Sequence, residues 1–395
     1  MRCSCGRMFC HVLKHKWVLL ISMLINMGIG LVMPITTIYI HTVLGKPLSV
    51  AGTTLLFFSG ASMVGNVIGG RLFDRWSHKG PVIVGQTIAS LSLLIIALSP
   101  TWPLYPIVLV FYGLGIGTAF ASFNGLVAIL QADEPLMFNY SFLAANVGMA
   151  VGSLSAGVLF AISIHLTFLV PGILFGLAVL IDIFKLEDGN AQTVKGPTNN
   201  VVSNPIHGAF RSIILIAFAF FVIWIGYSQW NTNLSTYMTS HGASVAEYSA
   251  LFTLNAVVLV LIQPFGNRIL PRIFPRKKYQ VIFGTVVFAC SFLMIIHQPH
   301  YINFVMGMLL LTFGEMVVMP TIPAWLNEFA TPGNRGTIQS ISSLAGGFGR
   351  AVGPLLGSLI IEATSYPAMF MWLCAADIVG AGLLVLAIDR QPNGK

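Results

Sequence analysis

The chain has 395 residues, of which 56% are hydrophobic and only 8% are charged. Soluble domains carry about 25% charged residues, so this composition excludes a protein whose surface lies mainly in water. The net charge of +8 would suit a nucleic-acid-binding protein, but the basic residues lie in short gaps between long apolar runs. We therefore expect no nucleic-acid partner.

Long apolar runs follow one another along the whole chain. A helix that crosses a bilayer needs roughly 20 mostly apolar residues, and twelve runs approach this length. They are centred near residues 28, 60, 89, 116, 150, 174, 224, 255, 288, 313, 348 and 377. The sequence therefore predicts an all-α integral membrane protein with twelve transmembrane helices.

The gaps between the runs differ in charge. When the gaps are assigned alternately to two sides of a membrane, 18 basic residues fall on one side, Lys46 alone falls on the other and Arg350 lies inside a run. Cytoplasmic loops carry such an excess of Lys and Arg. We expect a multi-pass protein of a bacterial cell membrane, in contact with lipid and with both termini in the cytoplasm.

A polar segment divides the chain. Residues 185–209, KLEDGNAQTVKGPTNNVVSNPIHGA, are rich in Gly, Pro and Asn, a composition typical of flexible linkers. This segment predicts a bundle of six helices over 1–184, a cytoplasmic linker over 185–209 and a second bundle of six over 210–395.

Glycines recur at one spacing in the two halves. The fifth run contains GMAVGSLSAG and the eleventh contains GRAVGPLLGS. Three glycine pairs are 201 residues apart, namely Gly148 and Gly349, Gly152 and Gly353, and Gly113 and Gly314. Together with the six-plus-six pattern, this spacing predicts a duplicated parallel repeat, in which a pseudo-two-fold axis relates the bundles.

The same runs carry a Gly/Pro motif with small residues four apart. Its residues are Gly148, Gly152, Gly157, Gly349, Gly353, Pro354 and Gly357. Small residues at this spacing let helix backbones approach closely in lipid. The motif indicates either ordinary close packing of helices or a flexing seam along which the two halves rock.

Charge is concentrated in GGRLFDRWSHKG, residues 69–80, between the second and third runs. This stretch resembles the signature loop of the major facilitator superfamily, roughly G-x-L-x-D-R-x-G-R-K. Five residues match it, namely Gly70, Leu72, Asp74, Arg75 and Lys79. Ser77 and His78 stand where that signature has Gly and Arg.

Two further stretches are similar to those of the drug:proton antiporters in this superfamily. GIGLVMP, which ends at Pro34, resembles their Pro-containing first span, and GRAVGPLLG resembles their G-x-x-x-G-P-x-x-G motif. That motif is usual in their fifth span, where this chain has Ser153 in place of Pro. Their Arg in the fourth span is missing here, at about Phe111, and the loop between the eighth and ninth spans keeps Gly266 but no Asp.

The resemblance implies a role for the signature loop. In the family this loop is a cytoplasmic latch, whose Asp faces the N-terminus of a helix in the other half. A helix N-terminus favours an anion. We therefore expect Gly70, Leu72, Asp74, Arg75 and Lys79 to form a latch, and a solvated topology loop is the alternative.

Three ionisable residues lie near the middle of apolar runs: Glu315, Arg350 and Asp377. Ionisable groups inside a membrane are costly and usually functional. Because burial favours the protonated form of a carboxyl group, we expect Glu315, and secondarily Asp377, to couple protons, with Arg350 as charge partner. A static ion pair with Arg350 is the alternative for each acid.

The seventh run, WIGYSQWNTNLSTYM, is too polar to face lipid and should face a cavity or unwind. Its aromatic residues could stack on a flat solute, and asparagines in other runs could add hydrogen bonds. The candidate cavity residues are Asn26, Asn124, Asn146, Trp224, Tyr227, Gln229, Trp230, Asn231 and Asn255. For each asparagine alone, a helix–helix hydrogen bond is the alternative.

These observations predict a secondary active transporter, which exports amphipathic organic compounds in exchange for protons by alternating access. A sugar or small-metabolite transporter on the same fold, and a non-transporting membrane sensor or scaffold, are the alternatives. We expect a functional monomer that is not an enzyme, with a small organic solute and protons as ligands, no cofactor and no metal site.

Overall fold

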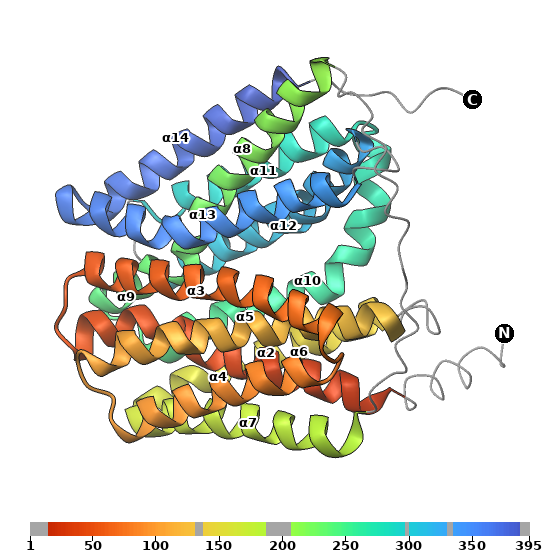
Figure 1. Ribbon diagram of the computed structural model, residues 1–395. Coiled ribbons are helices and arrows are strands. Elements are labelled where there is room, and N and C mark those ends of the chain that lie inside the picture. The colour runs from red at the N-terminus through yellow and green to blue at the C-terminus, as the bar shows by residue number, and fades with distance from the viewer. Residues whose placement is uncertain (1–14, 131–136, 187–206, 297–299, 330–334, 388–395) are drawn as a thin grey trace, which may run out of the picture. The chain divides into compact units, whose positions relative to one another are not determined.

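The computed structural model describes residues 15–130, 137–186, 207–296, 300–329 and 335–387 (Figure 1). Over these ranges the regular structure is helical and contains no strand, as the sequence predicts. Most of the predicted linker, 185–209, lies outside the described residues, and its role stays a prediction.

The chain divides into two compact units. Unit 1 comprises residues 1–192 together with 244–256, and unit 2 comprises residues 193–243 together with 257–395. The helix α10 (Val245–Ile273) contributes its first part to unit 1 and its second part to unit 2. Each unit is described below by itself.

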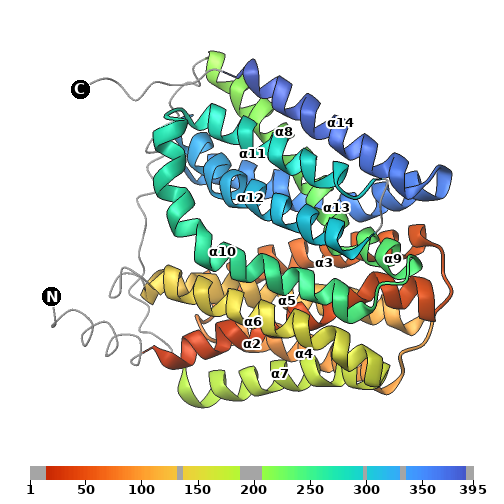
Figure 2. The same ribbon diagram turned by 180° about the vertical axis from the view of Figure 1, so that it is seen from behind.

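Unit 1 holds six long helices. They are α2 (Lys16–Ile38), which continues as a π-helical turn over Tyr39–Val43, α3 (Leu48–Arg75), α4 (Gly80–Leu98), α5 (Leu104–Leu130), α6 (Met137–Ile162) and α7 (Ile164–Lys185). Helix α6 packs along α2, α4 packs between α5 and α7, and α3 packs on α5 (Figure 2).

Unit 2 repeats this order. Its helices are α8 (His207–Asn231), the short α9 (Asn233–Ser240), the second part of α10, α11 (Lys277–Leu293), α12 (Tyr301–Leu326), which ends in a 3-10 turn over Asn327–Phe329, α13 (Arg335–Ala363) and α14 (Tyr366–Val385). Helix α13 packs along α8, and α11 packs on both α12 and α14.

A helix is present at each of the twelve predicted centres. Within the described ranges, eleven helical segments are long and apolar enough to cross a membrane. The twelfth, α11, has 17 residues, which is at the lower end of the lengths found for membrane-spanning helices. The fold is therefore all-α and membrane-spanning, with eleven spans clear by length and composition.

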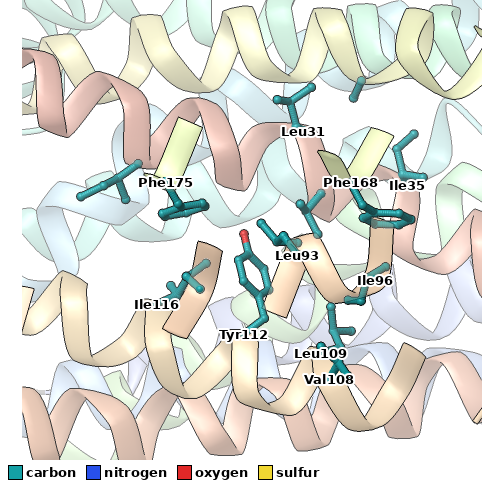
Figure 3. Packing of buried hydrophobic residues seen from close by; sticks show 14 of the residues in the cluster. Leu31, Ile35, Leu93, Ile96, Val108, Leu109, Tyr112, Ile116, Phe168 and Phe175 are labelled. Atoms are coloured by element: carbon teal, nitrogen blue, oxygen red, sulfur yellow. The ribbon is translucent and has the colours of Figure 1, made fainter. Parts of the chain in front are cut away.

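The core of unit 1 is built from large apolar side chains on four helices. Figure 3 shows Phe168 and Phe175 of α7 facing Leu93 and Ile96 of α4, with Tyr112 of α5 beside them. All five are fully buried. Because no water is expelled from between helices in lipid, the stability of this core comes from close packing rather than from the hydrophobic effect.

Two glycines of the predicted motif bring α6 against α2. A Cβ atom added at Gly148 would overlap the backbone of Met23, and one added at Gly152 would overlap the backbone of Met27. Backbone-to-backbone contact at four-residue spacing is the close helix packing that small residues permit.

Unit 2 makes the same contacts 201 residues later. A Cβ added at Gly349 of α13 would lie 2.6 Å from Trp224 Cβ of α8, and one added at Gly353 would overlap Ser228 Oγ. Trp224 and Ser228 stand 201 residues after Met23 and Met27. The predicted repeat is therefore present in the packing of α6 on α2 and of α13 on α8.

The predicted pairing of Gly113 with Gly314 is wrong. Gly113 packs against Phe58 of α3, whereas Gly314 packs against Gly284 of α11. The counterpart of Gly314 is Gly115, which packs against Gly85 of α4. Residues two apart on a helix point about 200° from each other, so Gly113 and Gly115 face different neighbours. The repeat spacing over these helices is 199 residues rather than 201.

A lysine holds the last helix of each unit at its C-terminal end. In unit 1, Lys79 Nζ donates hydrogen bonds of 2.8 Å to the carbonyl oxygens of Ile183 and Leu186 at the end of α7. In unit 2, Lys278, which lies 199 residues later, donates to the carbonyl oxygens of Val385 and Ala387 at the end of α14. These carbonyls have no partner within their helix, and a cation there also interacts favourably with the helix dipole.

Replacing Lys278 by Met is expected to destabilise unit 2 by about 1–2 kcal/mol, because two charge-assisted hydrogen bonds are lost. The measurement is the midpoint of thermal unfolding of the purified protein in detergent, which should fall by a few degrees. Lys79→Met should have a similar effect. Arg272→Met, at an exposed position near the end of α10, is the control and should leave the midpoint unchanged; an equal fall in all three variants would contradict the prediction.

Candidate functional site

The seventh span is interrupted, as its polar sequence predicts. Helix α8 ends at Asn231 and α9 begins at Asn233, and Thr232 between them has non-helical backbone angles (φ −131°, ψ −85°). Its amide bonds to the Gln229 carbonyl at 3.2 Å, three residues back. The break frees backbone groups, which must find other partners inside a membrane.

Thr232 Oγ1 donates to one such group, the Ser228 carbonyl, at 2.7 Å, and a buried network of side chains lies beside the break, between α8, α9 and α13. Gln229 Nε2 donates to the Gly353 carbonyl at 2.7 Å, and Asn233 Nδ2 donates to Gln229 Oε1 at 2.7 Å and to the Pro354 carbonyl at 3.2 Å. Ser358 Oγ donates to Asn233 Oδ1 at 3.0 Å. The bonds to the two carbonyls join side chains of α8 and α9 to the backbone of α13 next to Pro354.

Two of the predicted cavity residues, Gln229 and Trp230, are buried between helices of unit 2. Gln229 is fully buried in this network, and Trp230 is 1% exposed and packs against Phe292 and Gly307. Neither side chain lines either of the two cavities described below, and a place for them in a substrate cavity stays a prediction. Residues one apart on a helix turn by about 100°, so the same polar run presents Trp224, Tyr227 and Asn231 to a different side.

Glu315 lies near the middle of α12 and is half-buried. The Tyr227 hydroxyl donates a hydrogen bond to Glu315 Oε1 at 3.2 Å. Asn231, one turn further along α8, contacts the Tyr227 carbonyl at 3.5 Å. The seventh span thus presents a hydroxyl to the acid that the sequence predicts as the proton carrier.

Arg350 lies on α13, and its guanidinium carbon sits 4.3 Å from the ring centroid of Trp224. This is a cation–π contact, and Arg stacks on aromatic faces in this way. No acidic side chain within the described part of the chain forms an ion pair with Arg350. The static ion pair, which the sequence analysis gives as the alternative for each acid, is thus not seen among the described residues, and the role of Arg350 as charge partner stays a prediction.

Aromatic rings connect the acid and the cation. The rings of Trp224 and Tyr227 are 5.1 Å apart and nearly perpendicular, and Tyr227 also stacks on Phe288 of α11. We call Trp224, Tyr227, Glu315 and Arg350 the charged aromatic cluster. It places an acid and a base at the two ends of a pair of rings, within unit 2.

Asp377 takes no part in these contacts. It is 1% exposed in α14, and neither of its carboxyl oxygens has a hydrogen-bond partner among the described residues. Proton coupling through Asp377 stays a prediction. The described residues also contain no group of three His, Cys, Asp or Glu side chains that could hold a metal ion.

Unit 1 contains a cavity of about 260 Å³. It brings together three asparagines that the sequence places in different spans: Asn26 on α2, Asn124 on α5 and Asn146 on α6. The other residues that line the cavity are not predicted from the sequence. Their side chains are aromatic, aliphatic or hydroxyl-bearing, and the sequence pattern does not distinguish them from ordinary core residues. These are Ser22, Ile25, Phe120, Phe123, Ser141, Phe142, Ala145 and Met149.

The asparagines of this cavity keep hydrogen-bonding capacity. Asn26 Nδ2 donates to the Ser22 carbonyl and Asn146 Nδ2 to the Phe142 carbonyl, each at 2.8 Å and within its own helix. The amide oxygens are not used in these bonds. The cavity is therefore neutral, with polar groups set among phenylalanine rings.

Asn255, the remaining predicted cavity residue, is 8% exposed in α10 and does not line this cavity. A second hollow, of about 370 Å³, lies between α10, α11 and α12, and its lining includes Lys277 and Gln280. Lys277 forms an ion pair of 2.8 Å with Glu328.

The signature loop lies where α3 ends and α4 begins. Asp74 occupies the last turn of α3, and its side chain lies outside what the structure describes. Arg75 is exposed, and a Cβ at Gly70 would meet no atom within 4 Å. Lys79 holds the end of α7, as described above. The latch stays a prediction, and so does flexing at the Gly/Pro motif.

The glycines of that motif contact helices of their own unit. Gly157 packs against Ala246 in the first part of α10, and Gly357 packs against Gln229 and Asn233. Pro354 lies within α13. The contacts are those of close helix packing.

Comparisons with known proteins agree with this fold. A model of the Major Facilitator Superfamily matches residues 18–341 and 216–395. The "Uncharacterized MFS-type transporter YttB" of Bacillus subtilis is 31% identical over 383 residues, which cover 96% of each chain. The "Quinolone resistance protein NorA" of Staphylococcus aureus is 21% identical over 378 residues, covering 94% of this chain and 95% of NorA.

Solved structures share the architecture at low identity. The nucleoside transporter NupG superposes with a TM-score of 0.78 at 14% identity, covering 95% of this chain and 99% of NupG. A POT family transporter in complex with a peptide gives 0.82 at 12% identity, covering 94% and 95%. With the family model spanning nearly the whole chain, these findings show that the protein belongs to the major facilitator superfamily.

Proposed function

We propose that the protein is a secondary active transporter that exports amphipathic organic compounds in exchange for protons. The observation that carries this proposal is the contact between Glu315 and Tyr227 in the middle of unit 2. A carboxyl group inside a membrane is costly and usually serves a proton or ion pathway. Here it lies beside the interrupted seventh span, which is the type of element that forms transporter binding sites.

The proposed roles follow from the cluster. Glu315 carries the proton, and Arg350 modulates the charge of Glu315. The rings of Trp224 and Tyr227 contact the solute. The asparagines of the unit 1 cavity add neutral hydrogen-bonding groups. The resemblance to NorA, whose name states quinolone resistance, supports an organic compound as the exported solute. The protein would work as a monomer with both termini in the cytoplasm of a bacterium.

The test is transport by the purified protein in proteoliposomes. The vesicles carry an amphipathic rhodamine dye and an imposed proton gradient, and dye movement is followed by fluorescence. We expect movement against the dye gradient while the proton gradient lasts, and none after a protonophore collapses it. Dye movement against its gradient that continues after the protonophore is added would contradict proton coupling.

A sugar or small-metabolite transporter is a second candidate function, which the neutral cavity of three asparagines favours. Amide groups among aromatic rings suit a hydroxyl-rich solute as well as a drug. If no dye moves but labelled sugars or nucleosides exchange in a counterflow assay, this candidate replaces export. A non-transporting sensor or scaffold would show no counterflow of any solute.

A further inference from the structure

We infer that the second hollow, between α10, α11 and α12, binds the headgroup of an anionic phospholipid from the membrane (Figure 2). The hollow lies in unit 2, where α10 ends and α11 begins, and the sequence analysis assigns this end of the helices to the cytoplasm. Basic pockets between transmembrane helices on that side bind the headgroups of anionic lipids. The inference does not depend on which solute the protein transports.

The first step concerns the origin of the space. Pro271 lies inside α10 and Pro320 inside α12, and a proline inside a helix removes a hydrogen bond and crowds the preceding turn. Gly266 has no side chain, and a Cβ atom added there would lie 3.2 Å from Met316 Cε. Between these residues a hollow of about 370 Å³ remains, which is at the lower end of the volumes of ligand sites.

The second step concerns the charge around the hollow. The stretch FGNRILPRIFPRKKYQ, residues 265–280, contains five basic residues and no acid. Arg272 and Arg276 are exposed, and Lys277 lines the hollow. The acid that the structure brings to Lys277 is Glu328, so positive charge remains in excess. Each Lys or Arg near an anionic membrane surface contributes about 1 kcal/mol of attraction.

The third step concerns Lys277 itself. Its ammonium group donates to the Ala324 carbonyl at 3.1 Å and forms an ion pair with Glu328 at 2.8 Å. The two side chains of this pair are 35% and 29% exposed, and an ion pair this open to solvent contributes only about 0–1 kcal/mol. A lipid phosphate can therefore take the place of Glu328 at little cost, while the Ala324 carbonyl keeps the ammonium group at the hollow.

The fourth step distinguishes a lipid from a soluble phosphate. Most other side chains that line the hollow are apolar, among them Leu270, Met316 and Val317. Ile273 on α10 and Tyr279 on α11 are exposed beside it in sequence, and Tyr is enriched at the headgroup level of membranes. A free phosphate has nothing to place against these apolar groups, whereas a phospholipid has a glycerol backbone and acyl chains.

The test is native mass spectrometry of the purified full-length protein in detergent, titrated with phosphatidylglycerol or with phosphatidylcholine of the same acyl chains. We expect the Kd of the first bound phosphatidylglycerol to be at least about fivefold lower than that of phosphatidylcholine, which is about 1 kcal/mol. Equal Kd values for the two lipids would overturn the inference. Glycerophosphoglycerol, the same headgroup without acyl chains, should not displace the lipid, and displacement would overturn the assignment to a lipid.

Two variants of the ion pair should act in opposite directions. Lys277→Gln removes the ammonium group and should raise the Kd of phosphatidylglycerol about fivefold. Glu328→Gln removes the competing carboxylate and should lower this Kd about twofold. Arg211→Gln, at an exposed position near the start of α8, is the matched control and should change neither Kd. A merely structural role of the ion pair predicts shifts in the same direction for both variants, and that result would overturn the inference.

Filling the hollow tests where the lipid binds. Ala324→Trp adds a large ring at an exposed position that lines the hollow, and it should raise the Kd of phosphatidylglycerol to that of phosphatidylcholine. Ala363→Trp, at the exposed end of α13, is the control, and the midpoint of thermal unfolding shows whether each variant is folded. Unchanged binding by folded Ala324→Trp would overturn the placement in the hollow. If this variant is unfolded, the opposite shifts at Lys277 and Glu328 still decide the matter.

Discussion

Glu315→Gln is expected to abolish gradient-driven export while leaving the protein folded. Gln has nearly the same shape as Glu and its side-chain oxygen still accepts the hydrogen bond from the Tyr227 hydroxyl. It cannot take up or release a proton in the accessible pH range. The variant therefore removes the exchangeable proton and keeps the packing around it.

The measurement is the rate of dye movement in proteoliposomes with and without an imposed proton gradient. In the unaltered protein the two rates should differ, and in Glu315→Gln both should equal the rate without a gradient. The midpoint of thermal unfolding in detergent, measured separately, shows that the variant is folded. Glu362→Gln is the matched control, because it removes an exposed acid at the end of α13, and it should export normally.

A different outcome would assign the proton-carrying role to another residue. If Glu315→Gln keeps its response to the gradient, the carrier is not Glu315, and Asp377 becomes the next acid to replace. Asp377 is buried in α14 and is the other acid near the middle of a span. The two replacements together distinguish a relocated proton site from the absence of proton coupling.

The sequence predicted the helices because length and hydropathy alone determine which segments can cross a bilayer. A helix lies over every predicted centre, and the predicted glycine spacing recurs in the contacts of α6 with α2 and of α13 with α8. The predicted break in the seventh span is present at Thr232. Each of these features depends on local composition or on a repeat within the chain.

The rotation of helices about their axes was harder to predict. The difference between Gly113 and Gly115 is two positions, yet these residues contact different helices. In the same way Gln229 and Trp230 are buried while Trp224 and Tyr227 are half-buried. A helix that is apolar on all sides has little amphipathic asymmetry, so its sequence does not specify which face meets a neighbour.

The partner of Arg350 illustrates this limit. The sequence left open an ion pair of Arg350 with Glu315 or Asp377, whereas the guanidinium lies on the ring of Trp224. Which side chain it meets depends on how α13 is rotated against α8, and this is set by Gly349 and Gly353. The glycine contacts that the repeat reveals therefore also determine the geometry of the charged aromatic cluster.

Gly353→Leu is accordingly expected to disrupt both the stability and the ligand binding of unit 2. Even a Cβ at this position would overlap Ser228 Oγ and come within 3.1 Å of the Ile225 backbone. Helix α13 would have to move away from α8, which would break the hydrogen bond from Gln229 to the Gly353 carbonyl. Overpacking of this kind costs about 3 kcal/mol, and the loss of a buried hydrogen bond adds about 1 kcal/mol.

The thermal unfolding midpoint in detergent measures the first effect, and a fall of roughly 10 °C corresponds to this cost. Gly382→Leu is the matched control, because a Cβ at Gly382 of α14 meets no atom within 4 Å. Gly152→Leu tests the repeat, since Gly152 occupies the equivalent place against Met27 in unit 1. If Gly353→Leu unfolds at the same temperature as Gly382→Leu, α13 does not approach α8 as closely as these contacts require. The positions of Trp224 and Arg350 would then have to be determined anew.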